Sequence, residues 1–513
     1  MIAVNVRRLG FYLLLSFALI SAGLTWWQVV EAGSLTSRQD NPQIIAARRS
    51  VLRGSIFDAR GMLLASSSVV DGIARRLYRD PAFAQVIGYA SLRYGASGIE
   101  RAWEDLLIGR TDPDPVRQLL DQILARQAQP KDITLTIDQR LQDFAAAQFG
   151  SALGAVVAID PRTGAILAMV SSPGFDATGF SGDPATAGGA FDALAADPRN
   201  PFVDRARQGH YTSGSILKVL TASAALDSGA ITPQTTFPDQ PQQETHGFLV
   251  DGFTIHEHKL GKTKPALWSL SEALQVSSNI FFAHVGLALG GDSLLEYARR
   301  FGFCAPIRIG DSQHFLSADA SYVSQPAGGD CGPFSDRVEL ANAAYGQGKV
   351  DVTPLQMALL AATIANDGIV PDPYLVRDVR GHAANPGDGP LATILQAYAA
   401  GTGHRAISSL TAAQVRSVMV DAVQGPIGVL YAGAARVTRF GVSGVLTAGK
   451  TGTAERDNAL PSHSWFIGFA PAQDGATPQI AIAVIVEGDG SGGLRAAPIG
   501  GAVMAEWLKL LAG

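Results

Sequence analysis

The chain has 513 residues, and at ~100–200 residues per domain this length predicts two or three domains. Its 40 Lys and Arg residues against 45 Asp and Glu residues give a net charge of −5, which argues against a dedicated nucleic-acid-binding protein because such a protein needs a basic surface. Charged residues make up only 17% of the chain and hydrophobic residues 47%, a composition too apolar for a disordered scaffold.

Basic residues are mostly arginine, and only eight of the 40 are lysine. Each Lys is therefore a candidate for chemistry that Arg cannot perform, since Lys can be tuned to release its proton whereas Arg stays charged. An ordinary surface charge is the alternative interpretation of each one.

The N-terminus predicts a membrane anchor. Residues 9–30 carry no charge, and 22 residues of helix span ~33 Å, enough to cross a bilayer core. Arg7 and Arg8 precede this stretch and Glu31 follows it, so the positive-inside rule keeps residues 1–8 in the cytoplasm and places the rest of the chain outside. A cleaved signal peptide is the alternative, but no clear A-x-A cleavage site is present.

Cysteine and histidine residues do not predict a metal site. Cys304 and Cys331 lie outside the reducing cytoplasm under this topology and could form one disulfide. Neither has the spacing of a metal ligand, and the stretch 256–258 (His-Glu-His) is interpreted as an exposed strand or loop, with a ligand pair as the alternative.

Residues 31–130 predict a pedestal rather than a catalytic core. Residues 53–61 indicate a short strand that runs into a turn, and a second strand follows at 62–65. A polar, Pro-containing linker at 126–131 ends this region, which shows little sustained periodicity.

Regular patterns follow from residue 131 to residue 513. The predicted elements are a strand at 133–137, a helix at 139–149, paired strands at 155–159 and 165–170, helical stretches near 216–228, 266–289 and 354–366, a buried strand at 480–486 and a closing helix at 502–511. Strands at both ends with helices between them predict one sheet with helices packed on it.

The first candidate catalytic element is Ser215-Ile-Leu-Lys218, which opens a helix after Gly214. Positions i and i+3 share a helix face, so a neutral Lys218 could act as the base for a Ser215 nucleophile. Taken alone, the pattern is weak and more often indicates a helix cap followed by a surface Lys.

The second and third candidate elements are Ser277-Ser-Asn279 and Lys450-Thr-Gly-Thr453. Ser277 could relay a proton, and Asn279 could hydrogen-bond a substrate amide. Gly452 permits close approach of a substrate backbone, while Lys450 and the hydroxyls of Thr451 and Thr453 suit a substrate carboxylate. A helix cap and a turn with an exposed Lys are the respective alternatives, but the three elements in this order are far more specific than any one of them.

One competing motif overlaps the third element. Residues 444–451 fit the nucleotide-binding pattern G-x-x-x-x-G-K-[ST]. Residues 445–447 are strand-like, however, and residues 453–457 do not continue as an apolar-faced helix, so we reject the nucleotide-binding interpretation.

Together the three elements resemble the S-x-x-K, S-x-N and K-T-G set of penicillin-binding proteins and serine β-lactamases. Further stretches resemble class B penicillin-binding proteins in particular, and they are residues 53–58, 154–173, 346–348, 353–358 and 464–471. The resemblance implies an α+β fold with an antiparallel sheet and helices on both sides. In it, residues 1–8 are a cytoplasmic tail, 9–30 a transmembrane anchor, 31–130 a pedestal resembling a dimerisation domain and 131–513 the transpeptidase domain.

The resemblance also implies the activity, a D,D-transpeptidase that cross-links peptidoglycan stem peptides and is trapped by β-lactam antibiotics. Ser215 would attack the D-Ala-D-Ala carbonyl while Lys218 takes its proton, and the backbone N–H groups of Ser215 and Thr453 would form the oxyanion hole. Ser277 and Lys450 would pass a proton to the leaving D-Ala, and Asn279 would orient the peptide. No metal or organic cofactor is implied, and the implied partner is a SEDS-family glycan polymerase in the membrane.

Two alternative functions and one departure accompany the resemblance. A β-lactam-hydrolysing or β-lactam-sensing enzyme would share the three motifs, and a non-catalytic scaffold of the wall-building complex is the binding-class alternative. Family members usually have Pro immediately before the Gly-Ser of the nucleophile loop, where this chain has Ser213, and this predicts a less rigid loop.

Overall fold

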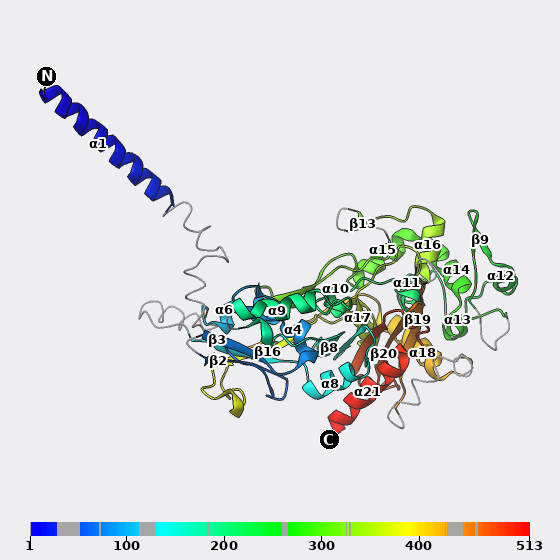
Figure 1. Ribbon diagram of the computed structural model, residues 1–513. Helices are drawn as coiled ribbons and strands as arrows, with labels where there is room; N and C mark the ends of the chain where they lie inside the picture. The colour runs from blue at the N-terminus through cyan, green and yellow to red at the C-terminus, as the bar shows by residue number, and fades with distance from the viewer. Residues whose placement is uncertain are drawn as a thin grey trace.

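The computed structural model describes residues 2–27, 52–70, 73–111, 129–181, 184–258, 265–324, 326–327, 330–425, 427, 445–456 and 460–512. The N-terminal helix α1 (Ile2–Thr25) extends away from the rest of the chain (Figure 1). Its segment Arg7–Thr25 has a mean hydropathy of 1.5, is not buried, and is long enough to cross a membrane. Most of the predicted anchor at 9–30 therefore lies on one helix, and its last three residues fall outside the described part of the chain.

A six-stranded sheet forms the pedestal, at the left of the folded body in Figure 1. Its order is β17-β16-β6-β1-β2-β3, with β1 (Ile56–Phe57), β2 (Leu63–Val70), β3 (Ile73–Tyr78), β6 (Lys131–Leu135), β16 (Val376–Gly381) and β17 (Ile394–Ala397). The predicted pair of strands at 53–65 is confirmed, because β1 and β2 pair antiparallel. On its other side β1 pairs parallel with β6, which pairs antiparallel with β16. Strands from beyond residue 130 thus complete this sheet, and a domain boundary at residue 130 stays a prediction.

Short elements pack beside the pedestal sheet. They are η2 (Pro81–Phe83), α4 (Ala84–Ile87), β4 (Ala90–Ser91), β5 (Gly95–Ala96), α5 (Gly98–Ala102) and α6 (Glu104–Leu107). Apolar side chains of α5 and α6, such as Ile99 and Leu107, are fully buried and join the main core. The pedestal is therefore a packed structure and not an extended stalk.

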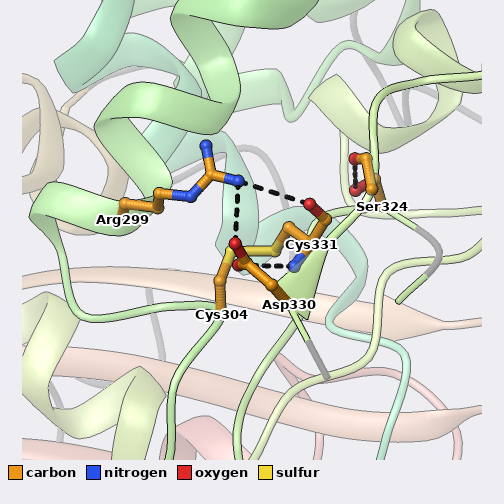
Figure 2. Close-up of a disulfide and its surroundings, with 6 residues drawn as sticks. Arg299, Cys304, Ser324, Asp330 and Cys331 are labelled. Carbon is orange, nitrogen blue, oxygen red and sulfur yellow. Dashed lines mark hydrogen bonds and ion pairs between the residues drawn. A yellow bond between two sulfur atoms is a disulfide. The ribbon is translucent and has the colours of Figure 1, made fainter. Parts of the chain in front are cut away.

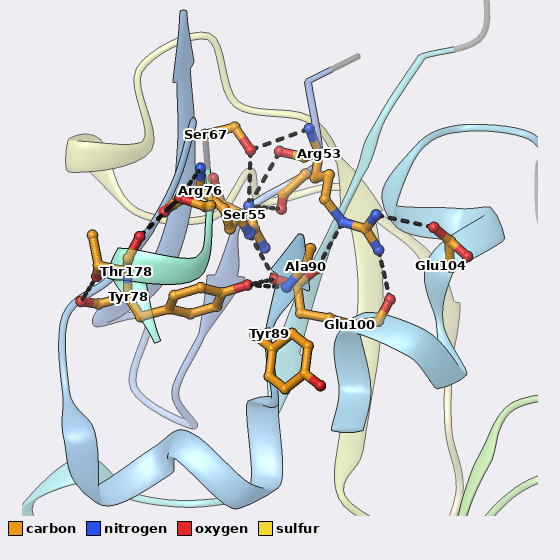
Figure 3. A network of polar contacts seen from close by, with 12 residues as sticks. Arg53, Ser55, Ser67, Arg76, Tyr78, Tyr89, Ala90, Glu100, Glu104 and Thr178 are labelled. Atoms are coloured by element: carbon orange, nitrogen blue, oxygen red, sulfur yellow. Dashed lines mark hydrogen bonds and ion pairs between the residues drawn. The ribbon is translucent and has the colours of Figure 1, made fainter. Parts of the chain in front are cut away.

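A buried charge network ties the start of the pedestal to its helices (Figure 3). Glu100 is completely buried, and its two carboxylate oxygens accept hydrogen bonds from Arg76 Nε at 2.6 Å and Arg53 Nε at 2.7 Å. Burial disfavours the charged carboxylate, yet the two guanidinium groups prevail and hold the pKa of Glu100 below its usual value. Arg53 also reaches Glu104, and Tyr78 donates its hydroxyl proton to Glu100.

A second, antiparallel sheet of five strands lies further from α1 (Figure 1). Its order is β19-β20-β21-β7-β8, with β7 (Gly154–Ile159), β8 (Ile166–Ser172), β19 (Ala448–Ala454), β20 (His463–Ala470) and β21 (Ile480–Val486). The predicted hairpin at 155–170 and the predicted buried strand at 480–486 are both confirmed. The nucleotide-binding interpretation is excluded, because Lys450 and Thr451 lie within a strand rather than in a loop that opens a helix.

Helices cover both faces of this sheet, as expected from the fully buried β21. Alternate residues of β21 serve alternate cores: Ile482 and Val484 pack with α8 and α21, whereas Ala483 and Ile485 face the larger core that contains α17. The helices and 3₁₀ turns of this part are α8 (Gln139–Ala147), η3 (Thr178–Phe180), α9 (Pro184–Ala195), α10 (Arg205–Gln208), η4 (Gly214–Leu217), α11 (Lys218–Asp227), α12 (Gln240–His246), α13 (Leu270–Val276), α14 (Asn279–Leu289), α15 (Gly291–Arg300), α16 (Arg337–Ala344), α17 (Pro354–Ala365), η5 (Pro386–Asp388), α18 (Ser409–Gln424) and α21 (Ala496–Ala512).

In the part of the chain that the structure describes, four two-stranded ribbons lie among the helices of residues 205–424, and a disulfide links one of them to the segment after α15. The ribbons are β9 (Phe248–Val250) with β10 (Phe253–Ile255), β11 (Ile307–Gly310) with β12 (Phe315–Ala318), β13 (Pro326–Ala327) with β14 (Asp330–Cys331), and β15 (Ile369–Val370) with β18 (His404–Arg405). Cys304, just after α15, is disulfide-bonded to Cys331 of β14 (Figure 2). Arg299 of α15 adds a hydrogen bond to the Cys331 carbonyl and an ion pair with Asp330. Within the described residues the one group of His, Cys, Asp or Glu ligand atoms close enough to hold a metal is Cys304, Asp330 and Cys331, and the disulfide occupies both sulfur atoms.

Candidate active site

The candidate nucleophile Ser215 lies on a tightly held turn. It is the second residue of η4, whose last residue is followed directly by α11. Gly214 before it has φ +57°, a conformation that favours glycine, and its N–H donates to Gly346 O at 2.9 Å. A Cβ on Gly346 would lie 1.9 Å from Gly214 O, so this second glycine allows the backbone behind the nucleophile to pack in direct contact. The hydroxyl-bearing side chain of Ser215 is half-buried, while Gly214 is buried.

Indole and hydroxyl groups hold the loop before the nucleophile. Trp465 Nε1 of β20 donates to Thr212 O at 3.1 Å, and Tyr211 forms a backbone bridge with Val352. Ser213, which replaces the usual Pro, is fully buried and its hydroxyl lies within hydrogen-bond distance of Gly346 O. The loop is therefore anchored without Pro, and whether it is less rigid than in relatives stays a prediction.

Lys218 begins α11 three residues after Ser215 and is completely buried. Its Nζ donates to Ser277 O at 2.6 Å and to Asn279 Oδ1 at 2.8 Å, and lies 3.4 Å from Ser277 Oγ. Within the described residues no hydrogen bond joins Lys218 to the Ser215 hydroxyl, a geometry common in enzymes without bound substrate. The partners of the Lys218 amine in the structure are therefore residues of the second element and not the candidate nucleophile.

The second element lies between two helices rather than within one. The helical stretch predicted near 266–289 is wrong in this respect, since α13 ends at Val276 and α14 begins at Asn279. Ser277 between them has the left-handed conformation with φ +60°, which is unusual for a residue other than glycine and needs support from its surroundings. At this break the Ser277 hydroxyl lies within hydrogen-bond distance of Lys218 Nζ.

Lys450 approaches the same hydroxyl from the five-stranded sheet. It lies on β19, the edge strand of that sheet, and its Nζ donates to Ser277 Oγ at 2.9 Å. Ser277 Oγ is therefore flanked by the two lysine amines. Burial, helped by the neighbouring Lys450 and opposed by Glu257, lowers the pKa of Lys218 well below its usual value, and burial lowers the pKa of Lys450 to about 7.

The remaining residues of the third element line the outer part of β19. Thr453 is exposed and Thr451 half-buried, and strand alternation places the two side chains on one face. Gly452 lies opposite the nucleophile loop, because a Cβ there would be 3.0 Å from Ser213 O. A Cβ on Gly214 would in turn lie 2.8 Å from Thr453 O, so the nucleophile turn packs directly against this strand.

One residue that contacts the candidate site was not predicted. Residues 256–258 form a loop as expected and His256 is exposed, but the expected exposure is wrong for Glu257, whose side chain is only 3% exposed. Its carboxylate accepts hydrogen bonds from Ser278 Oγ at 2.7 Å, Asn279 N at 2.8 Å and Ile280 N at 3.3 Å. The residue thus caps α14 at the second element. A His-Glu-His triplet carries no local signal of such burial, since the partner lies about 20 residues further along the chain.

Chemically, the site offers a hydroxyl nucleophile on a 3₁₀ turn, two lysines that titrate well below the usual range, and a serine hydroxyl between them. An amine that is neutral near physiological pH can accept the proton of an attacking hydroxyl, and a second hydroxyl and amine can return a proton to a leaving group. This is the arrangement expected for acyl transfer through a covalent Ser intermediate.

Comparison with known proteins places this geometry in context. Residues 154–505 match the family of the penicillin binding protein transpeptidase domain, and residues 53–133 match the penicillin binding protein A dimerisation domain. The peptidoglycan D,D-transpeptidase PbpA of Mycolicibacterium smegmatis is 36% identical over 98% of this chain and 99% of its own. The PbpA of Mycobacterium tuberculosis is 34% identical over 98% of both chains. A solved structure of penicillin-binding protein A from M. tuberculosis, an imipenem acyl-enzyme complex, superposes with a TM-score of 0.75 at 33% identity, covering 90% of this chain and 99% of the other.

Proposed function

The chain belongs to the penicillin-binding protein transpeptidase family, and on that basis we propose that it is a class B peptidoglycan D,D-transpeptidase with Ser215 as its nucleophile. The observation that carries the proposal is the hydrogen-bonded series Lys218–Ser277–Lys450, which lies beside the turn that presents Ser215. The relatives named above as D,D-transpeptidases, and the acyl-enzyme complexes of the M. tuberculosis protein, support the same reaction class.

In the proposed reaction, Ser215 Oγ attacks the carbonyl carbon of the penultimate D-Ala of a stem peptide and Lys218 accepts the hydroxyl proton. The N–H groups of Ser215 and Thr453 stabilise the oxyanion. The C–N bond to the terminal D-Ala then breaks, and this leaving amine takes a proton through Ser277 and Lys450. Attack by an amine of a neighbouring strand forms the cross-link and releases Ser215, and β-lactams acylate the same hydroxyl.

Substrate binding is assigned to the remaining motif residues. We propose that the peptide lies along the edge of β19, where Gly452 allows close approach and the Thr451 and Thr453 hydroxyls, with Lys450, bind its carboxylate. Asn279 orients a backbone amide through its side chain, whose oxygen already accepts a hydrogen bond from Lys218. These groups need no metal or organic cofactor.

Membrane topology and partner form part of the proposal. Arg7 and Arg8 lie at the start of the apolar segment of α1, and the positive-inside rule places this end in the cytoplasm and the catalytic domain outside. The anchor and the pedestal are the surfaces proposed to bind a SEDS-family glycan polymerase. The topology is tested by adding protease to intact spheroplasts, which should digest the catalytic domain. The partner is tested by co-purification of the glycan polymerase with the full chain, which should be lost when the anchor is deleted.

The central test is labelling of the detergent-solubilised full chain with fluorescent penicillin. We expect persistent labelling of the wild type and none of Ser215→Ala. Ser223→Ala is the matched control, because Ser223 is buried on α11, the helix that follows the turn carrying Ser215, and its hydroxyl is bonded only to Val219 O within the described residues. Equal labelling of wild type and Ser215→Ala would refute the assignment, and rapid loss of label from the wild type would indicate a β-lactam-hydrolysing enzyme instead.

A further inference from the structure

Glu257 connects a loop outside the three motifs to the N-terminus of α14. One oxygen of its carboxylate, Oε2, accepts from Ser278 Oγ and Ile280 N, and the other, Oε1, accepts from Asn279 N. Ser278 itself caps the helix by accepting from Phe281 N at 3.1 Å. A carboxylate at this position satisfies N–H groups that have no partner within the helix and interacts favourably with the positive end of the helix dipole.

Of the residues that contact Glu257, Asn279 also contacts Lys218. Asn279 donates its backbone N–H to Glu257 and accepts with its side chain from Lys218, both at 2.8 Å. Ser277, whose carbonyl and hydroxyl lie against Lys218, precedes this anchored segment in a left-handed conformation. A non-glycine residue persists in that conformation only when neighbouring contacts enforce it. Glu257 provides such contacts for the three residues that follow.

We propose that Glu257 is a positioning residue of the transpeptidase site, whose buried carboxylate fixes the start of α14 so that Ser277 and Asn279 are held against Lys218. The proposal rests on the function proposed above. It assigns to Glu257 no contact with substrate or with the reacting atoms.

The charge of Glu257 also acts on the site. Although burial disfavours its ionisation, the hydrogen bond and charge of His258, the charge of Lys218 and the N–H of Asn279 hold the pKa of Glu257 below its usual value. The titratable groups that face it within the described residues are His258 of its own loop, Glu244 of α12, Lys218 of α11 and Tyr345 after α16. Burial lowers the pKa of Lys218, and the negative charge of Glu257 partly offsets this effect. Removing that charge therefore lowers the pKa of Lys218 further.

The experiment measures the rate of acylation by fluorescent penicillin from about pH 5 to 9 on the full chain, where the acid limb reports protonation of the base. Glu257→Gln removes the charge and two of the acceptor positions. Ser278→Ala is the matched variant, because it removes a hydroxyl that caps the same helix and bonds Glu257 but leaves every charge in place. Glu257→Asp keeps the charge and shortens the reach.

We expect Glu257→Gln to slow acylation by about ten- to hundredfold and to move the acid limb to lower pH. Ser278→Ala should slow acylation less and leave the acid limb in its wild-type position. A folded Glu257→Gln protein with the wild-type rate and profile would overturn the inference. So would an equal loss in Glu257→Gln and Ser278→Ala with no movement of the limb, since the charged carboxylate would then contribute no more than the neutral Ser278 hydroxyl.

Glu257→Asp decides the matter if Glu257→Gln does not fold, as judged by its circular dichroism. It should then acylate more slowly than the wild type with its acid limb unmoved, and a wild-type rate would overturn the inference. The proposed function fails separately, because it requires acylation of the wild type itself. If penicillin acylates the wild type and acylates Glu257→Gln at the same rate, the result refutes the role of Glu257 and leaves the proposed function intact.

Discussion

Gly346 lies outside the three motifs, yet its substitution should disable the nucleophile turn. Gly346 and Gly348 both have positive φ, +88° and +72°, so a change to Ala strains the backbone at either position. The surroundings differ sharply. A Cβ on Gly346 would lie 1.9 Å from Gly214 O, whereas at Gly348 the nearest atom is Asn342 Cβ at 3.4 Å, an ordinary contact. The pair therefore separates backbone strain from displacement of the nucleophile.

The magnitude follows from this geometry. Left-handed strain costs about 1–2 kcal/mol in either variant, because the unfavourable conformation is the same. In Gly346→Ala the Gly214 carbonyl must also retreat by roughly 1 Å, and a misplacement of that size can cost about 100-fold in rate, or about 2.7 kcal/mol of barrier. The displaced carbonyl belongs to the residue directly before Ser215, so the loss should appear in acylation.

The assay compares second-order acylation rates by fluorescent penicillin with thermal unfolding of the same preparations. We expect both variants to lose stability, Gly346→Ala more than Gly348→Ala, but only Gly346→Ala to lose about 100-fold in acylation. A Gly346→Ala protein that is folded and acylates as fast as Gly348→Ala would refute the argument that the Gly346–Gly214 contact sets the position of the nucleophile.

Three further predictions concern charge and cross-linking. Glu100→Gln removes the carboxylate that pairs with the buried Arg76 and leaves Arg53 with Glu104 as its ion-pair partner. It should lower the free energy of opening of the pedestal sheet by about 3 kcal/mol, measured by hydrogen exchange, whereas the half-exposed Glu104→Gln should cost under about 1 kcal/mol. Equal effects of Glu100→Gln and Glu104→Gln would contradict the expected difference. Because the pKa of Glu100 is lower in the folded than in the unfolded protein, its stabilising contribution is present above the unfolded pKa and is lost as pH falls through the folded pKa. Lys450 loses its charge above its pKa of about 7, so acylation of the wild type should decline above that pH. The decline should be absent in Lys450→Arg, because Arg keeps its charge, and a decline retained in this variant would assign the titration to another group. The Cys304→Ser/Cys331→Ser protein should unfold about 3.5 kcal/mol more easily, from a 27-residue loop closure, and a denaturation curve equal to that of the wild type would show that the bridge adds nothing.

Patterns of neighbouring residues correctly predicted those helices and strands whose formation depends mainly on residues close together in the sequence. The alternating apolar residues of β21, the hairpin of β7 and β8 and the turn before α11 follow from residues adjacent in the sequence. The three motifs are of this kind, and the structure brings Lys218, Ser277 and Lys450 into direct contact.

Long-range contacts determine what could not be predicted. Nothing near Ser277 indicates that the helix breaks there, because the left-handed residue is a serine and not a glycine. The burial of Glu257 depends on a partner beyond the next helix, and the close packing of Gly346 on Gly214 joins segments more than 100 residues apart. Lys218 was predicted to contact Ser215, but its buried amine instead contacts three acceptor atoms of Ser277 and Asn279 in the second element.

The pedestal sheet has a consequence for the order in which the chain can fold. The strands β1, β2, β3 and β6 all lie before residue 136, but β16, which pairs with β6, is made much later, at residues 376–381. Non-local pairing of this kind forms slowly, because the intervening chain must be ordered first. The edge of β6 must therefore stay unpaired until most of the catalytic domain has been synthesised. A truncated chain that ends near residue 133 would keep that edge open and would be prone to aggregation.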